Sequence, residues 1–152
     1  YIRMTPDITK RMMDACYLAK RVREMLPELP AGVAPSYIHY LDIIEQLEDK
    51  KADVKISDIS DMLGIPRPGV TRTVKEMEKK GLLRKITSDE DARMIYIVAT
   101  DEGRKLSAKY NKRYFGELSE LLDDIPEEDV ENMIKTVEKI YNTMNERRIN
   151  LE

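Results

Sequence analysis

The chain has 152 residues, with one cysteine, one histidine and a formal net charge of −3. This length fits one domain with one hydrophobic core, and a single cysteine excludes an internal disulfide framework and suits a reducing cytoplasm. No stretch approaches the eighteen apolar residues of a membrane span and the N-terminus lacks the pattern of a signal peptide, so we expect a cytoplasmic protein with no membrane partner.

Two helices are predicted in the first third of the chain. Thr5 is placed as the N-cap of the first helix, which covers about residues 5–25 and ends before a loop rich in proline and glycine. The second helix begins at Pro35 and continues to about Asp49. Apolar residues recur every three or four positions in both helices, so each helix has one face to bury.

A short helix and a tight turn follow. The apolar spacing predicts a helix from residue 56 with Ser57 as its cap, and Gly64 ends it because glycine adopts the left-handed conformation without strain. A second short helix is predicted from about Pro68, a residue suited to the first helical position, to Gly81. The two helices and their turn are typical of a helix-turn-helix motif.

The second helix of this motif is predicted to have one apolar and one basic face. Val70, Val74 and Met77 recur at helical spacing and form the stripe that we expect to be buried. The opposite side carries polar and basic residues: Arg67, Thr71, Arg72, Lys75 and Lys79.

A β-hairpin is predicted after this helix. Residues 82–86 and 94–98 are rich in branched side chains and are joined by a charged loop. Thr100 then caps a helix that extends to about Leu122, and Pro126 opens the last helix. We therefore predict a mostly α-helical (α+β) fold, in which a winged helix-turn-helix core with a two-stranded β wing is flanked by terminal helices.

Four motifs of this region resemble the DNA-binding core of the MarR family of transcription regulators. In chain order they are ISDISDMLGI, PGVTRTVKEMEKKGLL, SDEDAR and ATDEGRKL. The resemblance implies a single MarR-like domain over 1–152, with its winged core at about 55–100 and dimerisation helices at about 5–25 and 101–151. The chain departs from the family pattern at Glu90, where wings often carry arginine, and at Pro68 and Gly69, where serine or threonine is usual.

The charge is unevenly distributed along the chain. From residue 67 to 85 there are seven basic and two acidic residues, whereas from residue 94 to the end nine basic residues face thirteen acidic ones. A local cationic patch is the feature that phosphate binding requires, and acidic helices elsewhere disfavour other orientations on DNA. The alternative is that these are the ordinary solvated faces of amphipathic helices.

The candidate DNA contacts on the recognition helix are Arg67, Pro68, Gly69, Thr71, Arg72 and Lys75. Arg72 is assigned to a base or a phosphate because its planar guanidinium grips two acceptors together. Thr71 is assigned to a thymine methyl or a phosphate, and Lys75 and Arg67 to the phosphate backbone. The two residues at the helix start that lack side-chain donors would let backbone N–H groups approach DNA. The alternative for Arg72 is a solvated arginine without a partner.

The wing supplies a second candidate contact. Asp91 and Arg93 are two residues apart, so strand alternation places both side chains on one side. The resemblance implies that Asp91 holds Arg93 for insertion into a minor groove, and an arginine there responds to groove shape rather than to single bases. Glu90 in this loop should weaken phosphate binding. The alternative is a plain salt-bridged turn.

Several residues are candidates for sensing a signal. A peroxide-sensing subgroup of MarR-like proteins uses a cysteine in its first helix, and Cys16 lies at a comparable place, although a small core residue is the alternative. A small-molecule effector pocket is the second hypothesis, and its candidate lining residues are Tyr17, His39, Tyr40 and Tyr110. Each of these is also compatible with an ordinary structural role.

An enzyme is not expected. One histidine and one cysteine cannot form a metal cluster, and no catalytic triad or phosphate-binding loop is present in the sequence, so no cofactor or metal is predicted.

The terminal helices carry more apolar surface than the winged core can cover, which favours a homodimer. We expect a repressor that binds a pseudo-palindromic double-stranded operator and is released by a small ligand or a stress signal. The alternative is a winged-helix protein-interaction module.

Overall fold

The computed structural model describes residues 3–152 and divides into two compact units, residues 1–35 and 36–152, which we consider separately. The first unit contains helix α1 (Pro6–Glu24). Its start is the predicted one, because the backbone N–H of Ile8 donates to Oγ1 of Thr5 at 3.2 Å and Pro6 occupies the first turn. All residues of α1 are at least partly exposed, and no residue from 3 to 35 is buried.

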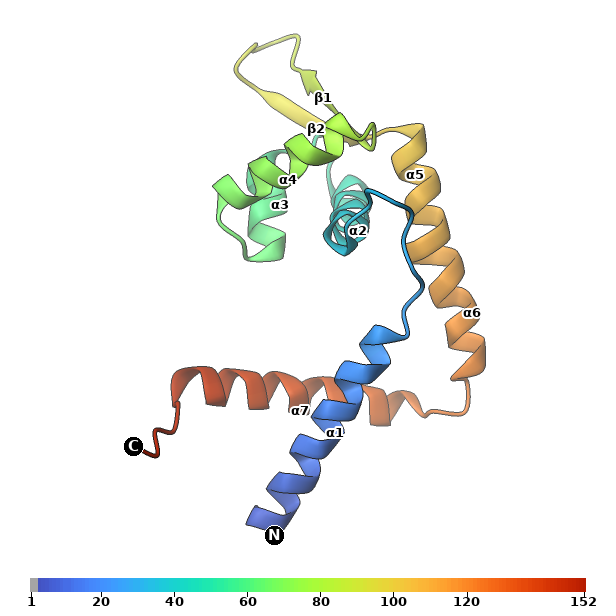
Figure 1. Ribbon diagram of the computed structural model, residues 1–152. Coiled ribbons are helices and arrows are strands. Elements are labelled where there is room, and N and C mark those ends of the chain that lie inside the picture. The colour runs from blue at the N-terminus through green and yellow to red at the C-terminus, as the bar shows by residue number, and fades with distance from the viewer. Residues whose placement is uncertain (1–2) are drawn as a thin grey trace. The chain divides into compact units, whose positions relative to one another are not determined.

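The second unit contains the remaining elements (Figure 1). In chain order they are α2 (Pro35–Lys50), α3 (Ile56–Leu63), α4 (Arg67–Lys79), β1 (Leu83–Thr87), β2 (Ile95–Ala99), α5 (Asp101–Ser107), α6 (Tyr114–Leu121) and α7 (Glu127–Glu146). Within this unit α3 packs against α4, α4 contacts β1, and β2 contacts α5. This arrangement is a winged helix-turn-helix, as predicted.

The hydrophobic core of the second unit joins the helices of the winged part to the wing. Its fully buried members are Leu41, Ile44, Val54, Ile59, Val70, Val74, Met77 and Ile97. They come from α2, from the segment before α3, from α3 and α4, and from β2. The orientation of α4 is therefore fixed by apolar contacts on its inner side, which leaves its outer side to solvent.

The wing is an antiparallel hairpin with a single register, in which Leu83 lies opposite Ala99 and Thr87 lies opposite Ile95. Each strand begins one residue later than predicted. The backbone N–H of Ile97 also donates to the carbonyl of Val54 at 2.8 Å. This bond ties the base of the hairpin to the segment that leads into α3.

Two glycines end helices of the helix-turn-helix as predicted, whereas the N-cap of α3 differs from the prediction. Gly64 and Gly81 have φ values of 66° and 75°, in the left-handed region that ends a helix. Ser57 is not the cap of α3, because the helix starts at Ile56 and the carboxylate of Asp58 instead accepts the backbone N–H of Lys55 at 2.8 Å.

Asp58 also accepts a hydrogen bond from the Lys51 ammonium at 3.0 Å. Its partial burial alone would raise the pKa of this carboxyl. The backbone N–H of Lys55 and the side chain of Lys51 together outweigh that effect and lower the pKa. The start of α3 is thus stabilised by a charged carboxylate, a contribution that is lost as the pH falls through the lowered pKa.

A network of bonds around Thr100 joins the end of α4, the start of the wing and α5. Thr100 Oγ1 accepts the backbone N–H of Gly103 at 3.1 Å, as predicted for an N-cap, and the same hydroxyl donates to the carbonyl of Gly81. The Thr100 N–H donates to the carbonyl of Leu82 at 3.1 Å. Gly103 is buried against this carbonyl, and a Cβ at this position would overlap with its oxygen.

The predicted helix over about residues 101–122 is observed, but a π-helical stretch at Ala108–Arg113 separates α5 from α6. The amide of Asn111 in this stretch donates to the carbonyl of Ile38 at 3.0 Å and to Ser107 Oγ at 2.9 Å. The π-helical stretch therefore lies where Asn111 forms a hydrogen bond to α2. Local apolar spacing does not predict this contact.

Helix α7 is amphipathic and its apolar side is open to solvent. Pro126 is its N-cap, and Glu127, Glu128 and Asp129 occupy the first turn. Six large apolar side chains of the helix are between 41% and 68% exposed: Val130, Met133, Ile134, Val137, Tyr141 and Met144. Among the described residues, no helix has both the length and the apolarity needed to cross a membrane.

Candidate nucleic-acid interface

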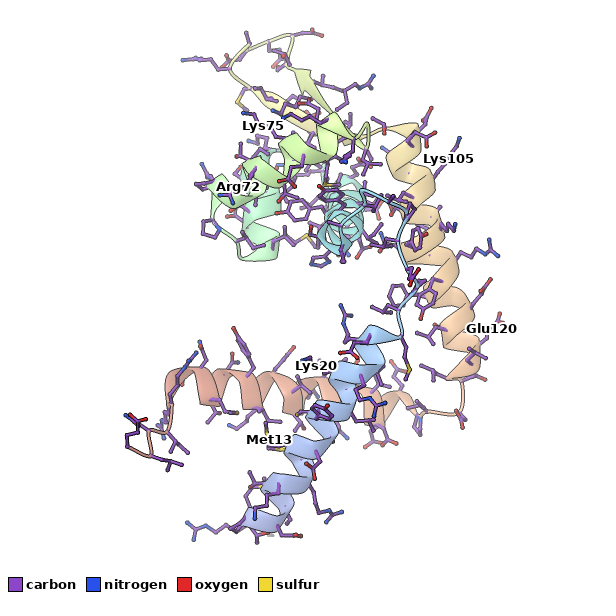
Figure 2. All side chains as sticks on the ribbon, viewed as in Figure 1. Met13, Lys20, Arg72, Lys75, Lys105 and Glu120 are labelled. Atoms are coloured by element: carbon purple, nitrogen blue, oxygen red, sulfur yellow. The ribbon has the colours of Figure 1, made fainter. Side chains whose placement is uncertain are left out.

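Helix α4 separates apolar from cationic side chains along its whole length. Val70, Val74 and Met77 are fully buried, with an exposed fraction of 0% each. The side chains on the outer side are exposed: Arg67, Pro68, Thr71, Arg72 and Lys75. Figure 2 shows Arg72 and Lys75 projecting from this helix. The apolar stripe thus sets the rotation of α4 and directs its polar side chains outward.

The start of α4 lies one residue before the predicted position. Arg67 is the first helical residue and Pro68 the second, with Pro66 as N-cap. Gly69 is half-buried, and a Cβ there would lie 3.3 Å from Cγ2 of Ile65 in the preceding turn. Its backbone N–H donates to the carbonyl of Pro66 at 3.1 Å, so this N–H is engaged inside the turn.

Both acidic residues of α4 are bound by side chains from other elements. The Tyr37 hydroxyl of α2 donates to Oε2 of Glu76 at 3.0 Å, and Lys85 Nζ of β1 lies 3.8 Å from Oε1 of Glu78. By contrast, neither Arg72 nor Lys75 forms a salt bridge within the described chain, residues 3–152. The positive charge of the outer side is therefore available to an external partner.

The loop of the wing presents one arginine. Nε of Arg93 lies 3.2 Å from Oδ1 of Asp91, and the backbone N–H of Arg93 donates to the same oxygen at 2.9 Å. The backbone hydrogen bond lowers the pKa of Asp91 most, and the side-chain hydrogen bond from Arg93 lowers it further. The pair lies in a turn of the loop and not on a strand, so backbone capping rather than strand alternation brings the two side chains together. The Arg93 side chain is 91% exposed.

Two residues near this surface were not singled out from the sequence. Arg84 is exposed on β1, opposite Val98. Strand alternation places it on the other face from Lys85, whose ammonium lies near Glu78 of α4. Tyr37 contacts α4 from a distance of 39 residues along the chain, and no local pattern predicts that contact.

The residues proposed for signal sensing are placed in both units. Cys16 and Tyr17 lie on α1 of the first unit, where Cys16 is half-buried and Tyr17 is 67% exposed. In the second unit His39 is exposed, whereas Tyr40 and Tyr110 are buried in the core. An effector pocket lined by these residues and a redox role for Cys16 stay predictions.

The fold and the outer side of α4 define a winged helix-turn-helix protein with a basic recognition helix. Residues 31–94 match the model of the MarR family. The match to the MarR family thus covers α2, α3, α4 and β1, the part of the chain that contains the helix-turn-helix. This family consists of regulators and not of enzymes, in agreement with the expectation from the sequence.

The chain has relatives both in sequence and in fold. The HTH-type transcriptional regulator YdgJ of Bacillus subtilis is 26% identical over 120 residues, which cover 78% of this chain and 70% of YdgJ. The crystal structure of AbsC, a MarR family regulator from Streptomyces coelicolor, matches with a TM-score of 0.69 at 15% identity and covers 97% of this chain and 100% of AbsC. At this identity, the likeness to AbsC concerns the fold.

Two further solved structures contain DNA. FabT of Streptococcus pneumoniae in complex with DNA matches with a TM-score of 0.59 and 19% identity, over 92% of this chain and 94% of that one. The MepR–DNA complex of S. aureus matches with a TM-score of 0.58 and 18% identity, over 92% of this chain and 96% of that one. The fold of this chain is therefore one that other proteins use on DNA.

Proposed function

We propose that this chain is a MarR-family regulator that binds double-stranded DNA as a homodimer and acts as a repressor at a pseudo-palindromic operator. The observation that supports this proposal best is α4, in which a fully buried apolar stripe is combined with outer cations, Arg72 and Lys75, that form no salt bridge within residues 3–152. A protein-interaction module would require the buried stripe but would have no use for the cations. Sequence readout requires donors on an element that fits the major groove, and a helix fits there.

The contacts are divided between the helix and the wing. Arg72 contacts a base or a phosphate in the major groove, while Arg67, Thr71 and Lys75 fix the helix against the backbone. Arg93, held by Asp91, enters the adjacent minor groove, where a narrow groove attracts an arginine. The DNA complexes of FabT and MepR, which have this fold, support this proposal.

The dimer is formed through the terminal helices. The apolar side of α7 is exposed, and contact between apolar surface and water is unfavourable in free energy. A second copy of the chain covers this surface. Twofold symmetry then presents two α4 helices to successive major grooves about one helical turn apart. A ligand or stress signal relieves repression by favouring a dimer in which the two helices no longer match this spacing. A solved structure of MepR holds ethidium bromide, which supports a small molecule as the signal.

The first test is the salt dependence of binding to the promoter of its own gene. If six to ten phosphates are neutralised, the association constant should fall by about 10³–10⁵ between about 50 and 200 mM salt. Fluorescence anisotropy with a labelled duplex measures this slope, and a scrambled duplex of equal length is the control. Absence of binding at the lowest salt would contradict the proposal and favour the interaction module.

The second test concerns the dimer. Val137→Ala removes two methyl groups from the apolar side of α7, which should cost about 1 kcal/mol per copy and so weaken a symmetric dimer by about 30-fold. Analytical ultracentrifugation over a dilution series measures this constant. Glu138→Ala changes the neighbouring residue on the polar side and should leave it unchanged. A wild-type chain that sediments as a monomer at tens of micromolar would contradict the homodimer.

A further inference from the structure

The spacing of charges on α4 creates a competition for Arg72. Glu76 lies four residues after Arg72 on the same helix. Side chains four residues apart are neighbours on a helical surface, and an arginine and a glutamate at this spacing attract each other. Such a pair would occupy the guanidinium and cancel its charge at the position assigned to base contact. The structure contains no Arg72–Glu76 pair within the salt-bridge distance among its described residues.

The carboxylate of Glu76 is instead engaged by Tyr37. The phenol hydroxyl donates to Oε2 of Glu76 at 3.0 Å, and Tyr37 is only 7% exposed. Tyr37 lies near the start of α2, whose neighbouring residues Tyr40, Leu41 and Ile44 are buried in the core. The donor is therefore anchored, while Glu76 is an exposed side chain on a turn that faces solvent.

The chemistry of the donor suits this arrangement. Burial, followed by the hydrogen bond and the charge of Glu76, raises the pKa of Tyr37. The hydroxyl thus remains protonated throughout the physiological range and always has a hydrogen to donate. A hydrogen bond from a neutral donor to a carboxylate is charge-assisted and stronger than one between two neutral groups.

We propose that Tyr37 is a positioning residue that holds Glu76 away from Arg72 and so keeps the Arg72 guanidinium available to DNA. The inference rests on the proposed DNA-binding function and deepens it, because it assigns a role to a residue outside the recognition helix. Tyr37 itself is buried, with 7% of its surface exposed. It acts through the Glu76 carboxylate. Without Tyr37, this carboxylate would compete with a phosphate or a base for the Arg72 guanidinium.

The test is a double-mutant cycle measured by operator binding. Tyr37→Phe removes only the hydroxyl and should weaken binding by about two- to fivefold per recognition helix, the range of an exposed ion pair. Adding Glu76→Gln should restore the affinity, because the released side chain then has no charge with which to pair. Glu76→Gln should therefore strengthen binding more in the Tyr37→Phe background than in the wild type.

Two controls separate this mechanism from others. Glu78→Gln removes one negative charge from the same helix and should change binding equally in both backgrounds. In an Arg72→Ala background, Tyr37→Phe should cause no further loss. Thermal unfolding of each variant verifies that it is folded at the assay temperature.

The outcomes are distinct. If Tyr37→Phe binds as tightly as the wild type, or if Glu76→Gln fails to restore its affinity, the positioning role is wrong and DNA binding stands. If the wild type does not bind its operator at low salt, the proposed function itself fails. Rescue by Glu76→Gln is the result that a purely structural role of Tyr37 would not produce.

Discussion

Arg72→Ala should weaken operator binding by about 1–3 kcal/mol per half-site and relax the sequence preference at the base pair that it contacts. Two half-sites double this free energy on the whole operator. The reason is that Arg72 is exposed on the outer side of a helix whose rotation is fixed by three buried residues, and that its guanidinium forms no salt bridge within residues 3–152. Binding to a set of operators with single base changes measures both effects.

Lys75→Ala is the matched comparison on the same side of α4. A lysine that contacts a phosphate should lower affinity evenly for all sequences and reduce the slope against salt by about one. The sequence preference should then stay that of the wild type. Equal losses for both variants, with no change in preference for Arg72→Ala, would refute the assignment of Arg72 to a base.

Gly103→Ala should destabilise the fold by about 1–3 kcal/mol, and it should impair DNA binding through the wing. The added Cβ would overlap with the carbonyl oxygen of Leu82, an atom of the backbone that cannot move aside as a flexible side chain would. The start of α5 would have to withdraw from the base of β1, and the bonds of Thr100 would be stretched. Urea unfolding followed by circular dichroism measures the loss in free energy.

Gly116→Ala is the control for this substitution. Gly116 lies in the interior of α6, and a Cβ there meets no atom within 4 Å. Alanine should stabilise this helix by about 0.5–1 kcal/mol, since glycine is the poorer helix former. The two alanine variants should therefore change the free energy of unfolding in opposite directions. A neutral Gly103→Ala would mean that the junction between α5 and the wing is looser than its bonds indicate.

The winged core was predictable because its signals are local. Gly64 and Gly81 end helices through the left-handed conformation, Thr100 caps the next helix, and the spacing of Val70 and Val74 identifies the inner side of α4. Each of these effects depends on neighbours within one or two turns. The apolar periodicity therefore carried enough information to place the helices and the wing to within one or two residues.

The sequence did not predict features that depend on residues far apart in the chain. It also did not predict which of two nearby groups forms a given bond. The N-cap of α3 is Lys55 rather than Ser57, and the carboxylate of Asp58, which also binds Lys51, accepts the Lys55 backbone N–H. The π-helical stretch around Asn111 and the Tyr37–Glu76 hydrogen bond both bring α2 against later helices. A single sequence contains no periodicity that announces such contacts.

The candidate site was predicted in part. The exposed cations of α4 follow from helical spacing alone, whereas the pairing of Asp91 with Arg93 was implied by the family resemblance and is observed in a turn instead of a strand. The role of Glu76 could not be predicted, since the sequence shows only an acid among bases. Its hydrogen bond to Tyr37 joins residues 39 positions apart, a contact that the sequence does not reveal.

The edges of the hairpin have a consequence for solubility. An uncovered strand edge is a template on which a second chain can add a strand and begin aggregation. The bond from Ile97 to Val54 covers part of the β2 edge, whereas β1 is the outer strand of a two-stranded sheet and carries Arg84 and Lys85. Charges on an outer strand oppose such pairing, so Arg84 and Lys85 protect the free chain from self-association through its wing.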